Sequence, residues 1–323
     1  MRSVSIIIFF FPLCLNARLR LAKIFSDNMV LQRDQPIHIW GGGVPGKNVR
    51  IDFGDQVAIT QIEPDSTWSV ELRPQKVNPD PQSLRVESAG EKIVLRNILI
   101  GDVWLCIGQS NMEWPMLREM HFKEEVENSN QHLVRFFNPA YAGKNVSGTR
   151  FTDSIARLLT INDFYKGHWQ NCDSNTFKTM SAVAYYFGKQ LTGEMSVPVG
   201  LINLSIGGAP LETFISPDAL KNSERFSSKM DGDWLTNESL PLWTRERGTQ
   251  NVEEVLNVPG DLNGKNHAYK PGFAYTSGIE PMLQMPIKGI LCYQGESNAQ
   301  EIERVNEYSA LFALMVTDYR KRW

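Results

Sequence analysis

The first third of the chain, from about residue 20 to residue 97, consists of short runs in which apolar and polar residues alternate. The runs cover residues 37–40, 49–53, 68–72, 84–87 and 93–95, and turn residues separate them. Alternation with a period of two is typical of strands that bury one face. The pattern therefore predicts a small antiparallel β-sandwich domain over residues 18–98.

Beyond residue 100 the apolar runs no longer alternate. Three of them are continuous, at residues 103–107, 199–204 and 287–293, which indicates strands buried on both faces, as in a parallel sheet. Apolar residues at helical spacing lie between and after these runs: Val183, Tyr186, Phe187 and Leu191, and then Tyr308, Leu311, Phe312, Met315 and Tyr319. This order predicts an α/β domain over residues 99–323, whereas residues 222–270 are polar and poorly periodic and predict a long surface excursion.

The N-terminus has the form of a secretory signal. Arg2 precedes an apolar run at residues 4–15, and Ala17 offers a small residue for cleavage, so residues 1–17 are predicted to be a signal peptide. The run is shorter than the roughly 20 residues that span a bilayer, which disfavours a membrane anchor. Attachment of a lipid to Cys14 is a weaker alternative, because Leu13 is not small. The protein is therefore expected to be secreted or periplasmic.

Composition and charge exclude some classes of protein. The 323 residues are 42% hydrophobic and 21% charged, as in a globular protein, and 33 Lys and Arg against 36 Asp and Glu leave no basic block for nucleic acid. Beyond residue 17 three cysteines remain, Cys106, Cys172 and Cys292, and an odd number cannot all pair. We expect Cys106 and Cys292 to be free thiols buried in strands, and no Cys-x-x-Cys or histidine cluster supports a metal site.

Compact polar residues follow each of the three continuous apolar runs. The first run is followed by Ser110 and Asn111, the second by Gly207 and Gly208, and the third by Gln294. Ligands of open parallel sheets bind beyond the carboxyl ends of the strands. We therefore expect these residues to meet at one edge of the sheet.

Ser110 is the candidate nucleophile of this edge. A serine that attacks a carbonyl needs donors for the oxyanion that develops, and its own N–H, the N–H of Gly207 or Gly208 and the amide of Gln294 could supply them, with Asn111 holding the turn. A structural alternative is a capping box formed by Ser110 and Glu113, although Pro115 opposes a helix through this region. The motif is not the elbow of α/β-hydrolases, because Met112 replaces its second glycine.

Residues 108–116, 200–212 and 287–299 resemble the sialate O-acetylesterase family of SGNH hydrolases, and residues 24–32 and 271–272 resemble further stretches of it. The resemblance implies an SGNH-type sheet and a secreted or periplasmic serine esterase that removes O-acetyl groups from sialic acid or other acetylated sugars, without a metal or organic cofactor. By position, Ser110 matches the nucleophile, Gly207 and Gly208 cover the oxyanion glycine, and Gln294 lies in the donor motif. Glu296 and Asn298 belong to that motif in a supporting role.

The resemblance also implies a general base, a histidine near the C-terminus that follows an aspartate by three residues. None of the histidines fits this pattern: His38, His121, His132, His168 and His267. His267, with Asp261 nearby, is the best substitute. We therefore expect that a C-terminal part of the hydrolase domain is missing, that the sheet lacks a strand and leaves an apolar edge uncovered, and that activity is impaired.

An alternative function is a non-catalytic carbohydrate-binding protein that uses the β domain and a vestigial esterase pocket. Trp40 or Trp68 could then stack on a sugar, although tryptophan in an alternating strand is more often part of the core. The sequence fixes neither the sugar nor an oligomeric state. Candidate partners for a sugar carboxylate are Arg118, Arg135 and Arg150.

Overall fold

The structure is a computed structural model that describes residues 18–323, so the predicted signal peptide over residues 1–17 lies outside it. The described chain contains a nine-stranded sheet, a three-stranded sheet and two short two-stranded sheets. The helices are α1 (Ser110–Glu113), α2 (Phe122–Glu125), α3 (Asp153–Ala156), α4 (Ala182–Met195), α5 (Pro217–Lys221), α6 (Leu242–Val252) and α7 (Ile302–Arg322). No helix in this part of the chain is both long and apolar enough to cross a bilayer.

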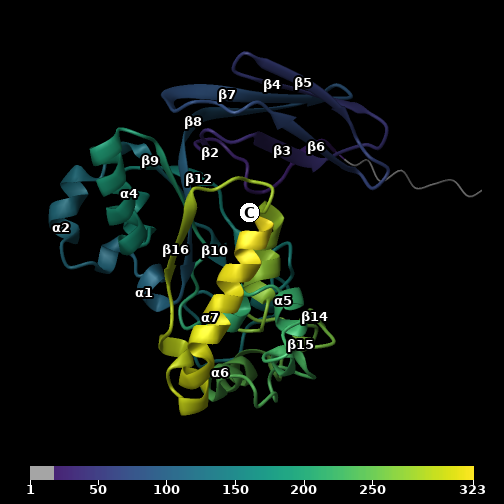
Figure 1. Ribbon diagram of the computed structural model, residues 1–323, viewed down its shortest axis with the longest axis vertical. Helices are drawn as coiled ribbons and strands as arrows, with labels where there is room; N and C mark the ends of the chain where they lie inside the picture. The colour runs from purple at the N-terminus through teal and green to yellow at the C-terminus, as the bar shows by residue number, and fades with distance from the viewer. Residues whose placement is uncertain (1–17) are drawn as a thin grey trace, which may run out of the picture.

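Two antiparallel layers form the N-terminal part. One is the three-stranded sheet of β1 (Arg20–Leu21), β3 (Ile37–Gly42) and β6 (Thr67–Leu72); the other comprises β4 (Asn48–Phe53), β5 (Gln56–Gln61), β7 (Asn78–Ser88) and the first half of β8 (Glu91–Gly108). Figure 1 shows β4, β5 and β7 above β3 and β6. Trp68 is 2% exposed and belongs to the core, as its alternating strand predicted. The five strands predicted from alternation are confirmed.

Strand β8 continues from this part into the second sheet. Its first half pairs antiparallel with β7, its middle pairs parallel with β2 (Val30–Gln32), and its second half pairs parallel with β13 (Val199–Asn203) and β16 (Gly289–Tyr293). The predicted boundary between residues 98 and 99 therefore lies within one strand. Arg33 forms two hydrogen bonds, of 2.9 and 3.0 Å, with the buried carboxylate of Asp102 in this strand.

The second half of the large sheet has the order β12-β9-β13-β8, with β16 on the other side of β8. All neighbours are parallel except β12 (Trp169–Cys172), which pairs antiparallel with β9 (Gln131–Phe137). The three strands predicted from continuous apolar runs are adjacent in this sheet, so the α/β prediction is confirmed. The two-stranded sheets pair β10 (Ala140–Tyr141) with β11 (Tyr165–Lys166), and β14 (Gly260–Asp261) with β15 (Gly264–Lys265).

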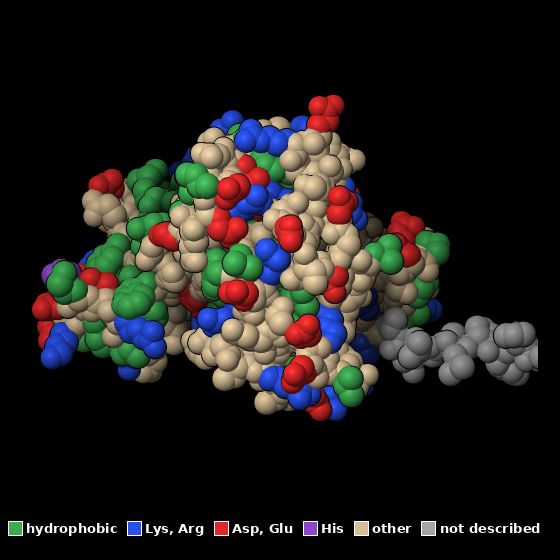
Figure 2. Space-filling model, turned by 90° about the horizontal axis from the view of Figure 1, so that it is seen from below, with side chains coloured by type: hydrophobic (Ala, Val, Ile, Leu, Met, Phe, Trp, Pro, Cys, Tyr) green, Lys and Arg blue, Asp and Glu red, His purple; other side chains and the backbone are tan. Residues whose placement is uncertain are grey.

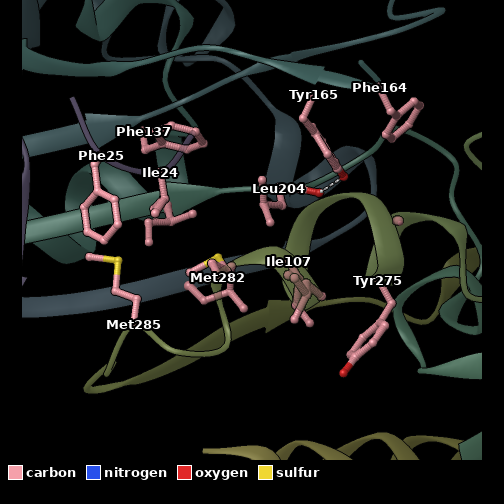
Figure 3. Close-up of a cluster of buried hydrophobic side chains, with 14 of the residues drawn as sticks. Ile24, Phe25, Ile107, Phe137, Phe164, Tyr165, Leu204, Tyr275, Met282 and Met285 are labelled. Carbon is pink, nitrogen blue, oxygen red and sulfur yellow. Dashed lines mark hydrogen bonds between the residues drawn. The ribbon is translucent and has the colours of Figure 1, made fainter. Parts of the chain in front are cut away.

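Side chains of β8 enter two different cores. Leu105 and Ile107 belong to a cluster that includes Met315 of α7, whereas Cys106 belongs to a cluster with Tyr185 of α4. The sheet is thus covered on both faces, which is why its strands read as continuous apolar runs. Figure 3 shows part of the first cluster, in which Tyr165 donates a hydrogen bond to the carbonyl of Leu204 (2.9 Å).

Residues 222–270 are more buried than the sequence predicted, whereas strand β16 is less buried than its neighbours in the sheet. The predicted surface excursion over residues 222–270 is partly wrong, because it contains α6 and buries Trp234 and Leu240. Strand β16 is only half-buried and, within the described residues, pairs with β8 alone. An apolar groove of about 540 Å³ lies between β16 and α7.

On the face seen in Figure 2, acidic and basic side chains are interspersed, in line with the balanced charge count.

Candidate active site

Ser110 lies immediately beyond the carboxyl end of β8. The N–H of Gln109 donates to the carbonyl of Tyr293 (3.1 Å), which ties the turn to the end of β16. Helix α1 then begins at Ser110 and ends at Glu113, before Pro115. The capping-box alternative is therefore wrong, because Gln109 is the N-cap residue and makes no side-chain cap. Ser110 is exposed, and its hydroxyl makes no hydrogen bond within residues 18–323.

The glycine pair after β13 lies beside this turn. The N–H of Gly207 donates to the carboxylate of Glu113 (2.5 Å), a residue that the sequence indicated only as a cap. The N–H of Gly208 makes no hydrogen bond within the described chain. Gly208 has a φ of +75°, and a Cβ there would lie 2.5 Å from the hydroxyl of Tyr269, so the position requires glycine. Of the two predicted donors, only Gly208 is free.

The third strand end is bonded to the other two. Gln294 donates through Nε2 to the carbonyl of Ala209 (2.8 Å), so its amide holds the glycine loop. Ser297 donates its N–H to Oε1 of Gln109 (2.9 Å) and its hydroxyl to the carbonyl of Gly208 (3.0 Å). The sequence analysis missed both Gln109 and Ser297. Their positions inside the two polar motifs were the signal that could have indicated them.

The remaining motif residues hold this arrangement from two sides. On the exposed side, the amide of Asn111 donates to the carboxylate of Glu296. On the buried side, Asn298 accepts the N–H of Leu211 (2.9 Å) and donates to Glu212 (2.8 Å). Asn298 is 1% exposed, so a supporting role, as the sequence analysis predicted, is consistent with its position.

Two adjoining clefts open at this edge. The cleft beside Ser110 has a volume of about 520 Å³ and is lined by Trp114, Arg118 and Lys178 among others. The second, of about 400 Å³, is lined by Gly207, Tyr269 and His267 among others. Glu113, Arg118 and Asn145 line both. The guanidinium of Arg118 lies 6.0 Å from the ring centroid of Trp114, and neither Arg118 nor Lys178 forms a salt bridge with any residue that the structure describes, so the cleft beside Ser110 carries positive charge that no carboxylate pairs.

His267 is near these clefts but is not arranged as a base for Ser110. It is 2% exposed, accepts the N–H of Tyr269 at Nδ1 (3.0 Å) and meets the Asn251 side-chain oxygen at Nε2 (3.1 Å). Burial, with a smaller contribution from Arg247, lowers the pKa of His267 to about 3. Asp261 pairs with Lys270 (2.5 Å) instead of His267. Both imidazole nitrogens therefore have other partners.

The other histidines lie away from Ser110. His38 is in β3 and contacts Glu71 at 3.5 Å, while His121, His132 and His168 are exposed. None of the four lines either cleft. Within residues 18–323, then, no histidine occupies the position of a general base.

The three cysteines beyond residue 17 are all free, although the odd count required only one of them to be. Cys106 is buried in β8 as predicted, Cys292 lies in β16 but is only partly buried, and Cys172 is also buried. Burial raises the pKa of Cys106 and of Cys172 to about 12 and that of Cys292 to about 11. These thiols are therefore protonated near neutral pH and are poor nucleophiles.

Comparison with known proteins gives one consistent answer. No family model matches the chain. The chain is 29% identical over 316 residues to the sialate O-acetylesterase of Homo sapiens, and this alignment covers 94% of the chain and 53% of the relative. It is 28% identical over 320 residues to the sialate O-acetylesterase of Rattus norvegicus. The resemblance to sialate O-acetylesterases is confirmed. The chain spans about half the length of these curated relatives.

The fold leads to the same group of proteins. The crystal structure of a carbohydrate acetylesterase from Xanthomonas citri matches with a TM-score of 0.69 at 25% sequence identity, covering 94% of this chain and 57% of that one. The similarity to an acetylesterase therefore extends over both the antiparallel layers and the parallel sheet.

Proposed function

We propose that the chain carries the nucleophile and oxyanion site of a serine esterase that removes O-acetyl groups from sugars. One observation carries the proposal. Ser297 bonds both Gln109, next to Ser110, and Gly208, so the candidate nucleophile and the free glycine N–H are held at one edge of the sheet. The similarity to sialate and carbohydrate acetylesterases supports the same chemistry.

In the proposed mechanism the hydroxyl oxygen of Ser110 attacks the acetyl carbonyl carbon and loses its proton to a base. The carbonyl oxygen becomes an oxyanion, which accepts hydrogen bonds from the N–H groups of Ser110 and Gly208. Collapse expels the sugar hydroxyl, which takes up a proton, and leaves acetyl-Ser110. Water then hydrolyses this ester and restores the serine. Gln294 holds the Gly208 loop through Ala209.

The base is the missing component. Since no histidine within residues 18–323 contacts Ser110, we propose that this part of the chain does not supply the base. Loss of one member of a catalytic triad lowers turnover by several orders of magnitude, while the oxyanion site still contributes. The 323-residue polypeptide on its own is therefore expected to hydrolyse acetyl esters slowly at best.

The preferred substrate is an acetylated acidic sugar such as sialic acid. Trp114, which is 45% exposed, offers a ring for stacking beside Ser110, and Arg118 and Lys178 in the same cleft offer charges for a carboxylate. Of the other arginines considered, Arg135 is buried and bonded to the carbonyl of Val134, and Arg150 lies outside the cleft. Arg118 is thus the best-placed partner for a sugar carboxylate.

The first experiment compares the purified 323-residue chain with its Ser110→Ala variant. We expect a fluorophosphonate, which is a far more reactive electrophile than an acetyl ester, to label the parent chain slowly and the variant not at all, and hydrolysis of a generic acetyl ester to be weak or absent in both. Robust turnover by the parent that Ser110→Ala abolishes would mean that a residue of this chain acts as the base. Equal labelling of both proteins would exclude Ser110 as the nucleophile.

A carbohydrate-binding protein without catalysis is the second candidate, favoured by the absence of a base beside Ser110 in the described chain. It predicts glycan binding that persists in Ser110→Ala, together with no phosphonate labelling of the parent. The burial of Trp68 leaves only the half-buried Trp40 as a stacking residue in the β layers, which weakens this candidate.

For location, we propose export directed by residues 1–17, to the medium or to a periplasm. The apolar run at residues 4–15 before Ala17 supports it. N-terminal sequencing of protein recovered from outside the cytoplasm of a producing cell tests the proposal. A recovered chain that still begins at Met1 would contradict it.

A further inference from the structure

The carboxylate of Glu113 is contacted by three donors from two other segments, residues 141–144 and the glycine loop after β13. Its Oε2 accepts the N–H of Gly207 (2.5 Å) and the hydroxyl of Tyr141 (3.2 Å), and its Oε1 lies 3.0 Å from Nζ of Lys144. The Glu113 side chain is 15% exposed. Three contacts on one largely buried side chain make this cluster an internal connection of the fold rather than a surface contact.

The connection joins the two elements that the proposed reaction needs. Glu113 is the last residue of the short helix that begins at Ser110, and Gly207 precedes the free donor Gly208. A Cβ at position 207 would lie 2.6 Å from Oε2 of Glu113, so the carboxylate can approach this closely only because residue 207 is glycine. Glu113 also lines both clefts, which places its side chain between them.

We infer that Glu113 is a positioning residue for the oxyanion site of the proposed esterase. Its carboxylate uses the N–H of Gly207 to fix the glycine loop against the helix of Ser110, and this leaves Gly208 as the glycine donor. The inference rests on the proposed function. It assigns different tasks to two adjacent glycines that the sequence could not distinguish.

The opposite reading treats the carboxylate as a plug that a substrate must displace from Gly207. The contacts oppose this reading. Displacement would separate Glu113 from Lys144 and Tyr141 as well. A partly buried carboxylate that loses several partners at once is destabilised, because no hydrogen bond then offsets its desolvation. The loop would also lose the hydrogen bond from the N–H of Gly207 that ties it to α1.

The test measures phosphonate labelling of Ser110 in Glu113→Ala, in Glu113→Gln and in the matched control Glu124→Ala, whose side chain is exposed on α2. The glutamine keeps an acceptor for the N–H of Gly207 and loses the charge. A misplacement of about 1 Å in a reacting site can lower rates on the order of 10²-fold. We expect Glu113→Ala to lower the maximal labelling rate by about that factor with little change in the half-saturating concentration. Glu113→Gln and the control should stay close to the parent.

Hydrogen exchange of the amides in residues 205–209 gives an independent readout. The inference predicts faster exchange in Glu113→Ala and parent-like exchange in Glu113→Gln. Labelling of Glu113→Ala as fast as, or faster than, the parent would overturn the inference and favour a plug. Equal losses in the alanine and glutamine variants would overturn it too, because charge and not the bond to Gly207 would then matter. Failure to label the parent chain would instead overturn the proposed function.

Discussion

At the scale of single residues, His267 shows how burial decides chemistry. In sequence it was the best substitute for the missing base, yet the folded chain surrounds it with Phe151 and Trp234, each stacked at 5.6 Å between ring centroids. Its pKa falls from 6.5 to about 3. The imidazole therefore stays neutral between these values in the folded state, whereas the unfolded chain binds a proton.

This difference makes stability depend on pH. The contribution of neutral His267 to the free energy of unfolding is complete above about pH 6.5. It is lost progressively as the pH falls toward 3, because the unfolded state gains a proton that the folded state excludes. Between pH 7 and pH 5 the loss amounts to about 2 kcal/mol. In His267→Gln, whose amide can serve both Tyr269 and Asn251, the fall in the free energy of unfolding over this range should be smaller by that amount.

Urea unfolding of both proteins at the two pH values measures the effect. His132→Gln, an exposed histidine, is the control and should retain the parent's pH dependence. If His267→Gln and the parent lost the same free energy between pH 7 and pH 5, His267 would be protonated in the folded state, contrary to its buried contacts.

The candidate site was partly predictable from sequence at this scale. Ser110 and Gly208 lie together at the sheet edge because both follow buried strands, and that order is visible in the sequence. The bond between Glu113 and Gly207 was not predictable, since residues 94 positions apart meet only after the sheet has formed. The same holds for the contact between Gln109 and Ser297.

At the scale of elements, a buried cluster of charges joins the motif after β16 to the helices beneath it. Lys229 is 2% exposed and its ammonium contacts Glu212 (2.9 Å), Glu307 of α7 (2.6 Å) and the carbonyl of Ser239 (2.7 Å). Glu212 in turn accepts a bond from Asn298 (2.8 Å). The position of the Asn298 turn therefore depends on a lysine that lies outside every motif.

We expect Lys229→Met to destabilise the protein by about 3–5 kcal/mol, because it leaves the buried carboxylate of Glu212 without its cation, whereas Glu307 keeps Arg304 at 3.2 Å. The midpoint of urea unfolding measures the change. Lys76→Met is the matched control: Lys76 also contacts a carboxylate, that of Asp34 at 2.7 Å, but its side chain is 92% exposed, and no shift of the midpoint is expected. An unchanged midpoint in Lys229→Met would show that the buried cluster does not stabilise the fold.

The elements that sequence predicted share one property, a regular apolar pattern. Strands β8, β13 and β16 and helices α4 and α7 all have it, and all were predicted. Strand β9 was missed because Gln131, His132 and Arg135 interrupt its apolar residues, and α6 was missed because its sequence is mostly polar. Pairing with β13 stabilises β9, and no local pattern records such a long-range partner.

At the scale of the whole molecule, strand β8 makes the antiparallel layers and the parallel sheet parts of one hydrogen-bonded structure. Eighteen residues run from Glu91 to Gly108 without a break. Asp102, in the middle, is 3% exposed and bonded to Arg33 and Gln32 from the N-terminal part. Sequence could predict two patterns of hydrophobicity on either side of residue 98, but it could not predict that one strand carries both.

The shared strand predicts that the two parts unfold together. A fragment of residues 99–323 would lose β2, β7 and both partners of Asp102, and a buried carboxylate left without partners strongly opposes folding. We expect the full chain to show one cooperative thermal transition, with coincident curves from circular dichroism and from hydrogen exchange in residues 37–72 and 199–204. The fragment should show no cooperative transition. If it unfolded cooperatively near the temperature of the full chain, residues 18–98 would be a separate domain, and the continuity of β8 would carry no stability.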